Sequence, residues 1–216
     1  MTNEKTDYKT LLKGKMPKIL LIGIVIAVFQ QWCGINVIFN YAQEIFEGAG
    51  YGVSYILFNI VITGVTNVIF TFVGMYTVDK LGRRTLMLFG SFSLMCIYAV
   101  LGYCYFAGIS GIFVLILVMM AIAAYAMTLA PVTWVVLSEI FPNRVRAMAM
   151  AISTFALWTA CFILTYTFPI LNSGLGSYGT FWVYGIICLG GYLFVRKTLP
   201  ETKHKTLEEI EKEISK

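Results

Sequence analysis

Charged side chains are scarce in this chain. Of its 216 residues, 12% are Asp, Glu, Lys or Arg and 59% are apolar, with a mean hydropathy of +0.80. Soluble domains carry about a quarter of their residues as charges. This composition argues against an ordinary water-soluble domain and predicts a protein whose main solvent is a lipid bilayer.

Residues that perform catalysis or hold metals are equally scarce. His204 is the only histidine and lies in a polar tail, which excludes a histidine-based catalytic or metal cluster. The five cysteines lie inside apolar stretches without CxxC or metal-ligand spacing, which is typical of small apolar filling residues. No nucleophile, base and orienting group share one plausible site. We therefore expect neither an enzyme nor a bound cofactor or metal.

The apolar residues fall into six long stretches. Each approaches or exceeds the roughly 20 residues that cross a hydrocarbon core of roughly 30 Å. The predicted spans are Ile19 to Gln43, Tyr55 to Val78, Leu86 to Ala107, Ile112 to Leu137, Ala147 to Ile170 and Thr180 to Val195. The sequence thus predicts an all-α membrane protein with six transmembrane helices at 19–197, a linker at 1–18, and a tail at 198–216 with a short helix from Thr206.

Lys and Arg are absent from three of the loops between these stretches, at 44–54, 108–111 and 172–179. All sixteen fall in four clusters: Lys5, Lys9, Lys13, Lys15 and Lys18; Lys80, Arg83 and Arg84; Arg144 and Arg146; and Arg196, Lys197, Lys203, Lys205, Lys212 and Lys216. Six spans place every cluster on one side, which the positive-inside rule makes cytoplasmic. Both termini are then cytoplasmic. Since topology accounts for the net charge of +5, it does not indicate a nucleic-acid partner.

The six spans divide into two groups of three, and the first span of each group is interrupted. The first span runs through Gln30 to Asn36, where three amide side chains accompany Gly34. The fourth contains Pro131, whose missing N–H predicts a bend or an unwound turn. Breaks at matching positions are typical of 3+3 inverted-repeat transporters and indicate their ligand sites.

The amides need partners, because burying each without one costs roughly 2 to 7 kcal/mol. Gln31 and Asn36 lie about 140° apart on a straight helix, and a kink at Gly34 would bring them together. Beside the indoles of Trp134 and Trp158, such amides suit a neutral polyhydroxylated ring. The alternative interpretation is hydrogen bonding between helices without a ligand.

The cytoplasmic ends carry a second polar pattern. Glu139 lies near the membrane boundary, where an unpaired carboxylate is costly. We expect it to pair with Arg83, Arg84, Arg144 or Arg146. These arginines either anchor the chain at the interface or form pairs that break when the protein changes conformation.

Taken together, these motifs resemble in order and spacing the C-terminal half of the sugar porter family of the major facilitator superfamily, nearest to its bacterial xylose-proton symporters. The matching segments are Gln30 to Asn36, Asp79 to Arg84, Pro131 to Trp134, Ser138 to Arg146 and Pro200 to Lys203. The resemblance implies sugar-contacting positions at Gln30, Gln31, Asn36, Asn67, Trp134 and Trp158. It also implies a cytoplasmic gating network of Asp79, Arg83, Arg84, Glu139 and Arg144.

Some positions depart from the family pattern. Asn40 replaces the first tyrosine of a pair, Ala130 replaces a glycine, and Leu157 and Cys161 replace amide-bearing residues. The family has twelve spans, and its first six carry the acidic residue used for proton coupling.

We therefore expect a half-carrier of the bacterial inner membrane that moves a pentose or hexose by alternating access. It would be proton-coupled when paired with an N-terminal six-helix half. Alternatives are a homodimer of two copies, a membrane sugar sensor, or a remnant without function.

Overall fold

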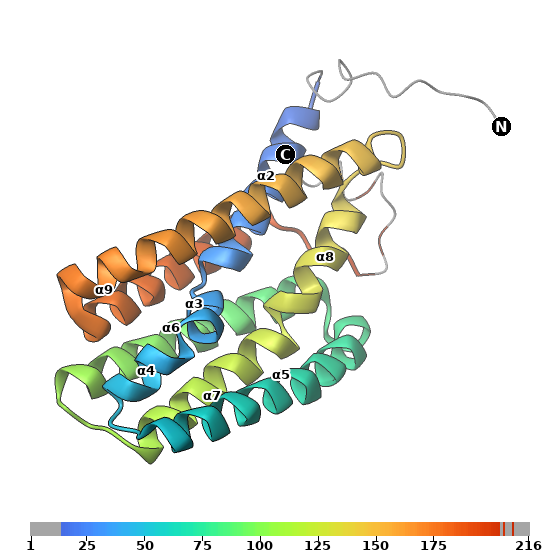
Figure 1. Ribbon diagram of the computed structural model, residues 1–216. Helices are drawn as coiled ribbons and strands as arrows, with labels where there is room; N and C mark the ends of the chain where they lie inside the picture. Colours follow the sequence, from blue (N-terminus) through green and yellow to red (C-terminus); the bar gives the residue numbers. More distant parts are fainter. Residues whose placement is uncertain (1–13, 204, 206–208, 210–216) are drawn as a thin grey trace.

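The computed structural model describes residues 14–203, 205 and 209, and every regular element in these residues is an α-helix (Figure 1). The helices are α2 (Met16–Trp32), α3 (Ile35–Asn40), α4 (Ala42–Gly48), α5 (Val53–Leu81), α6 (Arg83–Phe106), α7 (Ile112–Met127), α8 (Leu129–Ile140) and α9 (Arg146–Thr198). The tail helix predicted from Thr206 lies largely outside the described residues.

Five helical stretches are long and apolar enough to cross a membrane, and the last of them, α9, has 53 residues. Two predicted spans are contained in α9, because Gly176 has non-helical angles (φ 67°, ψ 171°). Figure 1 shows that the two limbs of α9 fold back beside each other. The chain reverses within the loop predicted at 172–179, but the loop itself is shorter than predicted, since a single glycine at positive φ reverses the chain while the flanking residues stay helical.

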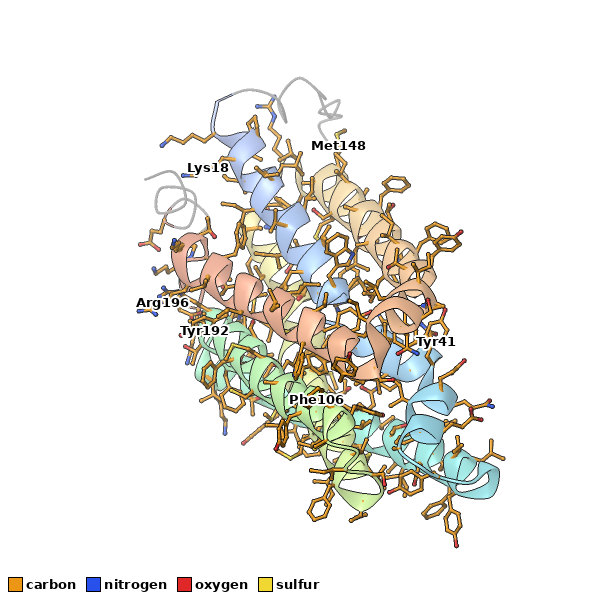
Figure 2. All side chains as sticks on the ribbon, turned by 90° about the vertical axis from the view of Figure 1, so that its left-hand side faces the viewer. Lys18, Tyr41, Phe106, Met148, Tyr192 and Arg196 are labelled. Atoms are coloured by element: carbon orange, nitrogen blue, oxygen red, sulfur yellow. The ribbon has the colours of Figure 1, made fainter. Side chains whose placement is uncertain are left out.

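Loops far apart in the sequence meet at the two ends of the bundle. At one end the backbone N–H of Gly111 donates to the carbonyl of Ala49 at 2.9 Å. At the other, Arg84 donates to the carbonyl of Arg196 at 2.8 Å, and the Lys203 ammonium donates to the carbonyl of Lys80 at 2.7 Å. These contacts bring the basic turn between α5 and α6 to the basic end of α9. Figure 2 shows Lys18 at the upper left, Arg196 at the left below it and Tyr41 at the right.

The break predicted at Gly34 is confirmed. The first span consists of α2 and α3, and Gly34 between them has φ 87°. A Cβ atom there would lie 2.8 Å from Cγ of the Tyr184 ring, on the second limb of α9. Left-handed backbone and close packing therefore both require glycine.

Replacing Gly34 by alanine tests the first break. We expect the Gly34→Ala variant to lose about 2 kcal/mol of unfolding free energy, since alanine at positive φ costs about 1 to 2 kcal/mol and Tyr184 must also shift. SDS-induced unfolding in mixed micelles measures this loss. Gly108→Ala is the matched control, because Gly108 has φ 68° with nothing within 4 Å of the added Cβ. Equal losses in both variants would contradict the role of the Tyr184 contact.

The second predicted break also occurs, slightly earlier than expected. The fourth span is divided into α7 and α8 at Thr128 (φ −121°, ψ −84°), and Pro131 lies in the first turn of α8. Proline is tolerated there because a backbone N–H in the first turn of a helix would have no helical acceptor. The proline ring also crowds the carbonyl of the residue four positions earlier. That residue is Met127, where α7 ends. Gly74 of α5 allows close approach, since a Cβ there would lie 2.8 Å from the Met127 carbonyl oxygen.

Burial is uneven across the bundle. In the best membrane-spanning window of α5 only 17% of residues are buried, against 67% for the stretch from Met16 to Asn40. The first limb of α9 likewise exposes Phe155, Trp158 and Phe162. Exposed apolar faces of this kind are suited to contact with lipid or with another helical bundle.

Candidate functional site

The amides of the first span form a continuous hydrogen-bonded row around the first break, which we call the amide ladder. The Asn36 amide nitrogen donates to Gln31 Oε1, and Gln31 Nε2 donates to Gln30 Oε1 at 2.9 Å. Gln30 Nε2 in turn donates to the Tyr125 hydroxyl at 2.8 Å. Because Gly34 breaks the helix, side chains that a straight helix would hold apart meet. The expected pairing of Gln31 with Asn36 is therefore confirmed.

The ladder is buried at one end and partly open at the other. Gln30 and Gln31 are 4% and 6% exposed, whereas Asn36 is half-buried. The Asn36 amide nitrogen also lies 3.8 Å from Cys161 Sγ on α9. The sequence interpretation treated Cys161 as a filling residue, but here it lines the open end. This end is where a ligand can reach the amides.

Two residues of the site were not recognised from the sequence. One is Cys161, and the other is Tyr125, at the end of the ladder. Tyr125 carries a hydroxyl within the otherwise apolar sequence of α7, three residues before the break at Thr128. A phenol hydroxyl in an apolar helix needs a hydrogen-bond partner. The tyrosine in this apolar sequence was therefore the signal that could have indicated the site.

The remaining predicted sugar contacts lie on three different helices. Trp158 precedes Cys161 by about one helical turn on α9, so the two side chains are neighbours on the helix surface. Trp158 is 63% exposed. Trp134 on α8 is 39% exposed. Asn67 is half-buried in the middle of α5. Within residues 14–203 no hydrogen bond joins these three side chains to the amide ladder.

The segment around the first break is fastened to α9 by two side chains. Trp32 Nε1 donates to the carbonyl of Ala160 at 3.1 Å, and the Tyr41 hydroxyl donates to the carbonyl of Thr165 at 2.9 Å. The Thr165 carbonyl lacks its usual helical donor, because the residue four positions later is Pro169. Tyr41 thus satisfies a carbonyl that the proline leaves free.

Removing the Tyr41 hydroxyl tests this connection. We expect Tyr41→Phe to lower the unfolding free energy by about 1 kcal/mol, since the part-buried Thr165 carbonyl loses its donor. The ring contact with Phe168, at 4.5 Å between centroids, is retained. In the background of Pro169→Ala, which restores the backbone N–H, the same change should cost less. An equal cost in both backgrounds, measured by SDS unfolding, would contradict this explanation.

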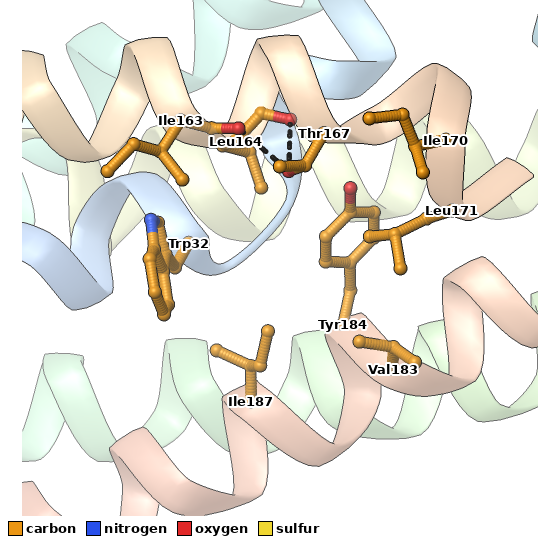
Figure 3. Close-up of a pocket in the computed structure, with 9 residues that line it drawn as sticks. All are labelled: Trp32, Ile163, Leu164, Thr167, Ile170, Leu171, Val183, Tyr184 and Ile187. Atoms are coloured by element: carbon orange, nitrogen blue, oxygen red, sulfur yellow. Dashed lines mark hydrogen bonds between the residues drawn. The ribbon is translucent and has the colours of Figure 1, made fainter.

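An apolar cavity lies beside the ladder rather than on it. This crevice, of about 350 Å³, lies between Trp32 and the two limbs of α9 (Figure 3). Its lining includes Thr167 and Tyr184, but the Thr167 hydroxyl already donates to the carbonyl of Ile163 at 2.7 Å. With so few free polar groups, this crevice is a poor site for a polyhydroxylated ligand.

The charges predicted at the basic end of the bundle form a compact network, in which Arg83 is the partner of Glu139. Its Nη2 lies 2.9 Å from Glu139 Oε1 and 3.0 Å from Asp79 Oδ1. The Arg83 side chain is 13% exposed and that of Glu139 is 27% exposed, whereas that of Asp79 is 80% exposed. Exposed pairs contribute little, so the Arg83–Glu139 pair dominates.

The other predicted members of this network are placed differently. Arg84 donates to the Arg196 carbonyl, and Arg146 donates to the carbonyl of Phe141 at 3.1 Å. Arg144 is exposed and has no ion pair with the residues that the structure describes. The ion-pair network at this end of the bundle therefore has fewer members than expected, with the partly buried Arg83–Glu139 pair at its centre.

The start of the tail completes the network, which the sequence did not reveal. Glu201 Oε1 accepts from the backbone N–H of Arg83 at 2.8 Å, at the first residue of α6. The Thr202 hydroxyl donates to Glu139 Oε2 at 2.6 Å. A carboxylate at a helix N-terminus is favourable. The tail thereby ties α6 to α8.

The fold and the site define a class: an integral membrane protein of apolar helices with two interrupted spans, buried amides at the first of them, and a charge network at one end. Comparison with known families agrees, because the model described as "Sugar (and other) transporter" matches residues 1–214. The chain belongs to this family of the major facilitator superfamily.

Curated relatives are similar along nearly the whole chain. The D-xylose-proton symporter of Escherichia coli K12 is 39% identical over 213 residues, covering 96% of this chain and 43% of the relative. The arabinose-proton symporter of Bacillus subtilis is 40% identical, covering 94% and 44%. The glucose facilitated diffusion protein of Zymomonas mobilis is 34% identical, covering 89% and 42%. The chain thus spans less than half the length of these relatives.

Solved structures are similar in fold. The proton:xylose symporter XylE bound to 6-bromo-6-deoxy-D-glucose has a TM-score of 0.80 and 39% identity, covering 89% of this chain and 42% of that one. The inward-open conformation of the xylose transporter XylE from E. coli also has a TM-score of 0.80, with 37% identity and coverage of 94% and 44%. The all-helical major facilitator fold is therefore established for this chain.

Proposed function

We propose that this chain forms one six-helix bundle of a carrier for a pentose or hexose, xylose-like in its preference. The observation that carries this proposal is the amide ladder at the break between α2 and α3. Amides that offer donors and acceptors suit a ligand rich in hydroxyl groups. Relatives named as xylose, arabinose and glucose carriers support it.

The proposed binding site comprises Gln30, Gln31, Asn36, Asn67, Trp134 and Trp158. In it the half-buried Asn36 meets the sugar directly, with Gln31 behind it, and the two indoles cover the apolar faces of the ring. The six spans form two triplets of opposite topology, α2 to α6 and α7 to α9. This division places the interrupted spans at matching positions, as in carriers with inverted repeats.

Transport by alternating access needs a second bundle that rocks against this one around the site. We propose a six-helix unit of the same family as that partner. The exposed apolar faces of α5 and the first limb of α9 are suited to such contact. Two of the relatives are named proton symporters, and in our proposal the second bundle supplies the acidic residue for proton coupling.

The charge network would stabilise one conformation of the carrier. In this proposal Asp79, Arg83, Arg84, Glu139 and Arg144 lie on the cytoplasmic side of a bacterial inner membrane, together with both ends of the chain. The Arg83–Glu139 pair and the tail residues Glu201 and Thr202 then hold α6, α8 and the tail together. Separation of these elements accompanies the opening of the cytoplasmic side.

Uptake of radiolabelled D-xylose and D-glucose into vesicles tests the proposed function. Vesicles that contain only this chain should show no saturable uptake, and addition of a second six-helix unit should produce it. Saturable uptake by a proven monomer would contradict the need for a second bundle. Crosslinking in membranes would identify a homodimer instead. Sugar-dependent tryptophan fluorescence without uptake in either preparation would favour a sensor.

A further inference from the structure

The amide ladder has a direction, because every hydrogen bond along it is donated the same way. Asn36 donates to Gln31, Gln31 donates to Gln30, and Gln30 donates to the Tyr125 hydroxyl. Rotation of a side-chain amide group exchanges the positions of its oxygen and nitrogen with almost no change of shape. The orientation of the amide is therefore set by its hydrogen-bond partners. A tyrosine hydroxyl can donate or accept, and in this structure it accepts from Gln30, so that the amides that follow are all turned the same way.

Tyr125 is held firmly at that buried end. It lies in the last turn of α7, its side chain is 8% exposed, and its carbonyl accepts from the backbone N–H of Thr128 at 3.1 Å. The ladder thus connects the break at Gly34 to the break at Thr128.

The direction of the ladder decides what Asn36 offers to a ligand. Its amide nitrogen is engaged by Gln31 Oε1 and by Cys161 Sγ. Its carbonyl oxygen accepts no hydrogen bond from the residues that the structure describes. In this orientation Asn36 meets a sugar hydroxyl as an acceptor, and reversal of the ladder would present its nitrogen instead.

We propose that Tyr125 is a positioning residue for the sugar site. Its hydroxyl accepts from Gln30 and thereby fixes the direction of the ladder. In that direction the Asn36 carbonyl is the group that accepts a hydrogen bond from a sugar hydroxyl. This inference rests on the proposed function, since it assigns a role within the same site.

The Tyr125→Phe variant removes the acceptor and keeps the ring. Equilibrium binding of D-xylose and L-arabinose, which differ only in configuration at C4, is measured on the chain in lipid nanodiscs. We expect D-xylose affinity to fall about tenfold, the size of one unsatisfied buried amide, and the xylose-to-arabinose affinity ratio to change at least about threefold. A changed ratio is the decisive readout, because a purely structural loss lowers both affinities alike.

Tyr98→Phe is the matched control. The Tyr98 hydroxyl is also buried but has no hydrogen-bond partner among the described residues. Its removal should leave both affinities unchanged. If Tyr98→Phe changes the ratio as much as Tyr125→Phe does, the inference is overturned.

A double variant tests whether Tyr125 acts through Gln30. In a Gln30→Met background, Tyr125→Phe should have no further effect on either affinity, since the ladder is already cut. Additive losses would overturn the inference. The inference would also be overturned if the wild-type chain binds D-xylose and the xylose-to-arabinose affinity ratio is unchanged in Tyr125→Phe. The proposed function would stand in that case. Absence of saturable sugar binding by the wild-type chain would instead remove both proposals.

A measurement on the unaltered chain keeps the test independent of how the variants fold. The Gln30 side-chain amide protons should exchange with deuterium much more slowly than those of Gln43, which is exposed and donates to Glu47 at 2.8 Å. Side-chain amide resonances from ¹⁵N-labelled glutamine report both. Equal exchange rates would show that Tyr125 does not hold Gln30, which overturns the inference.

Discussion

Replacing Arg83 by methionine should lower the unfolding free energy by about 3 kcal/mol, the lower end of the range for breaking a buried ion pair. The variant leaves the Glu139 carboxylate, 27% exposed, without its cation near the membrane boundary. Methionine retains most of the apolar stem, so the loss reports charge rather than packing. SDS-induced unfolding in mixed micelles measures it. In the proposed carrier the same variant should also shift the conformational equilibrium away from the closed cytoplasmic side.

Arg144→Met is the matched control for this prediction. Arg144 belongs to the same basic end, is exposed, and forms no ion pair with the described residues. Its replacement should cost less than about 0.5 kcal/mol. Comparable losses in the two variants would show that general positive charge matters at this end, and would contradict the central place of the Arg83–Glu139 pair.

Replacing Gln31 by methionine should weaken D-xylose binding by about ten- to a hundredfold. The side chain is 6% exposed and links two amides, since it donates to Gln30 and accepts from Asn36. Its loss leaves a buried acceptor and a donor unsatisfied, at about 1 to 3 kcal/mol each. About 1.4 kcal/mol corresponds to a tenfold change in affinity.

Gln43→Met is the control, because it removes the same amide from an exposed site on α4. Sugar affinity should then stay within a factor of about two. Isothermal titration of both variants in nanodiscs separates the outcomes. Unchanged affinity in Gln31→Met, with the wild-type chain binding normally, would exclude the ladder from the sugar site.

Much of the fold was predictable from the sequence, because lipid imposes simple rules on length and polarity. The apolar stretches and the break at Gly34 followed directly from composition and from glycine's freedom at positive φ. The chain reversal at Gly176 lies within the loop predicted at 172–179, but the helical conformation of the residues around it was not predicted, since one glycine is enough to reverse the chain. The break near Pro131 was predicted, but its position at Thr128 depends on the carbonyl that the proline ring crowds.

The site was predictable only in part, because its contacts depend on packing between distant helices. Gln31 and Asn36 were expected to meet, and they do. Tyr125 and Glu201 join their networks from α7 and from the tail, and no local pattern revealed these partners. Glu139 had four candidate arginines, and only the approach of α6 to α8 selects Arg83.

The most direct test of the central claim is the distance from a bound sugar to the ladder. Solid-state NMR dipolar recoupling between ¹³C-labelled D-xylose and ¹⁵N-labelled amides of the chain in lipid measures it. We predict a sugar carbon within about 6 Å of the Asn36 side-chain nitrogen, because a hydrogen bond to the Asn36 carbonyl oxygen separates the two atoms by roughly one hydrogen bond and three covalent bonds. Saturable xylose binding without dipolar contact to Asn36, Gln31 or Gln30 would place the sugar elsewhere and contradict the account.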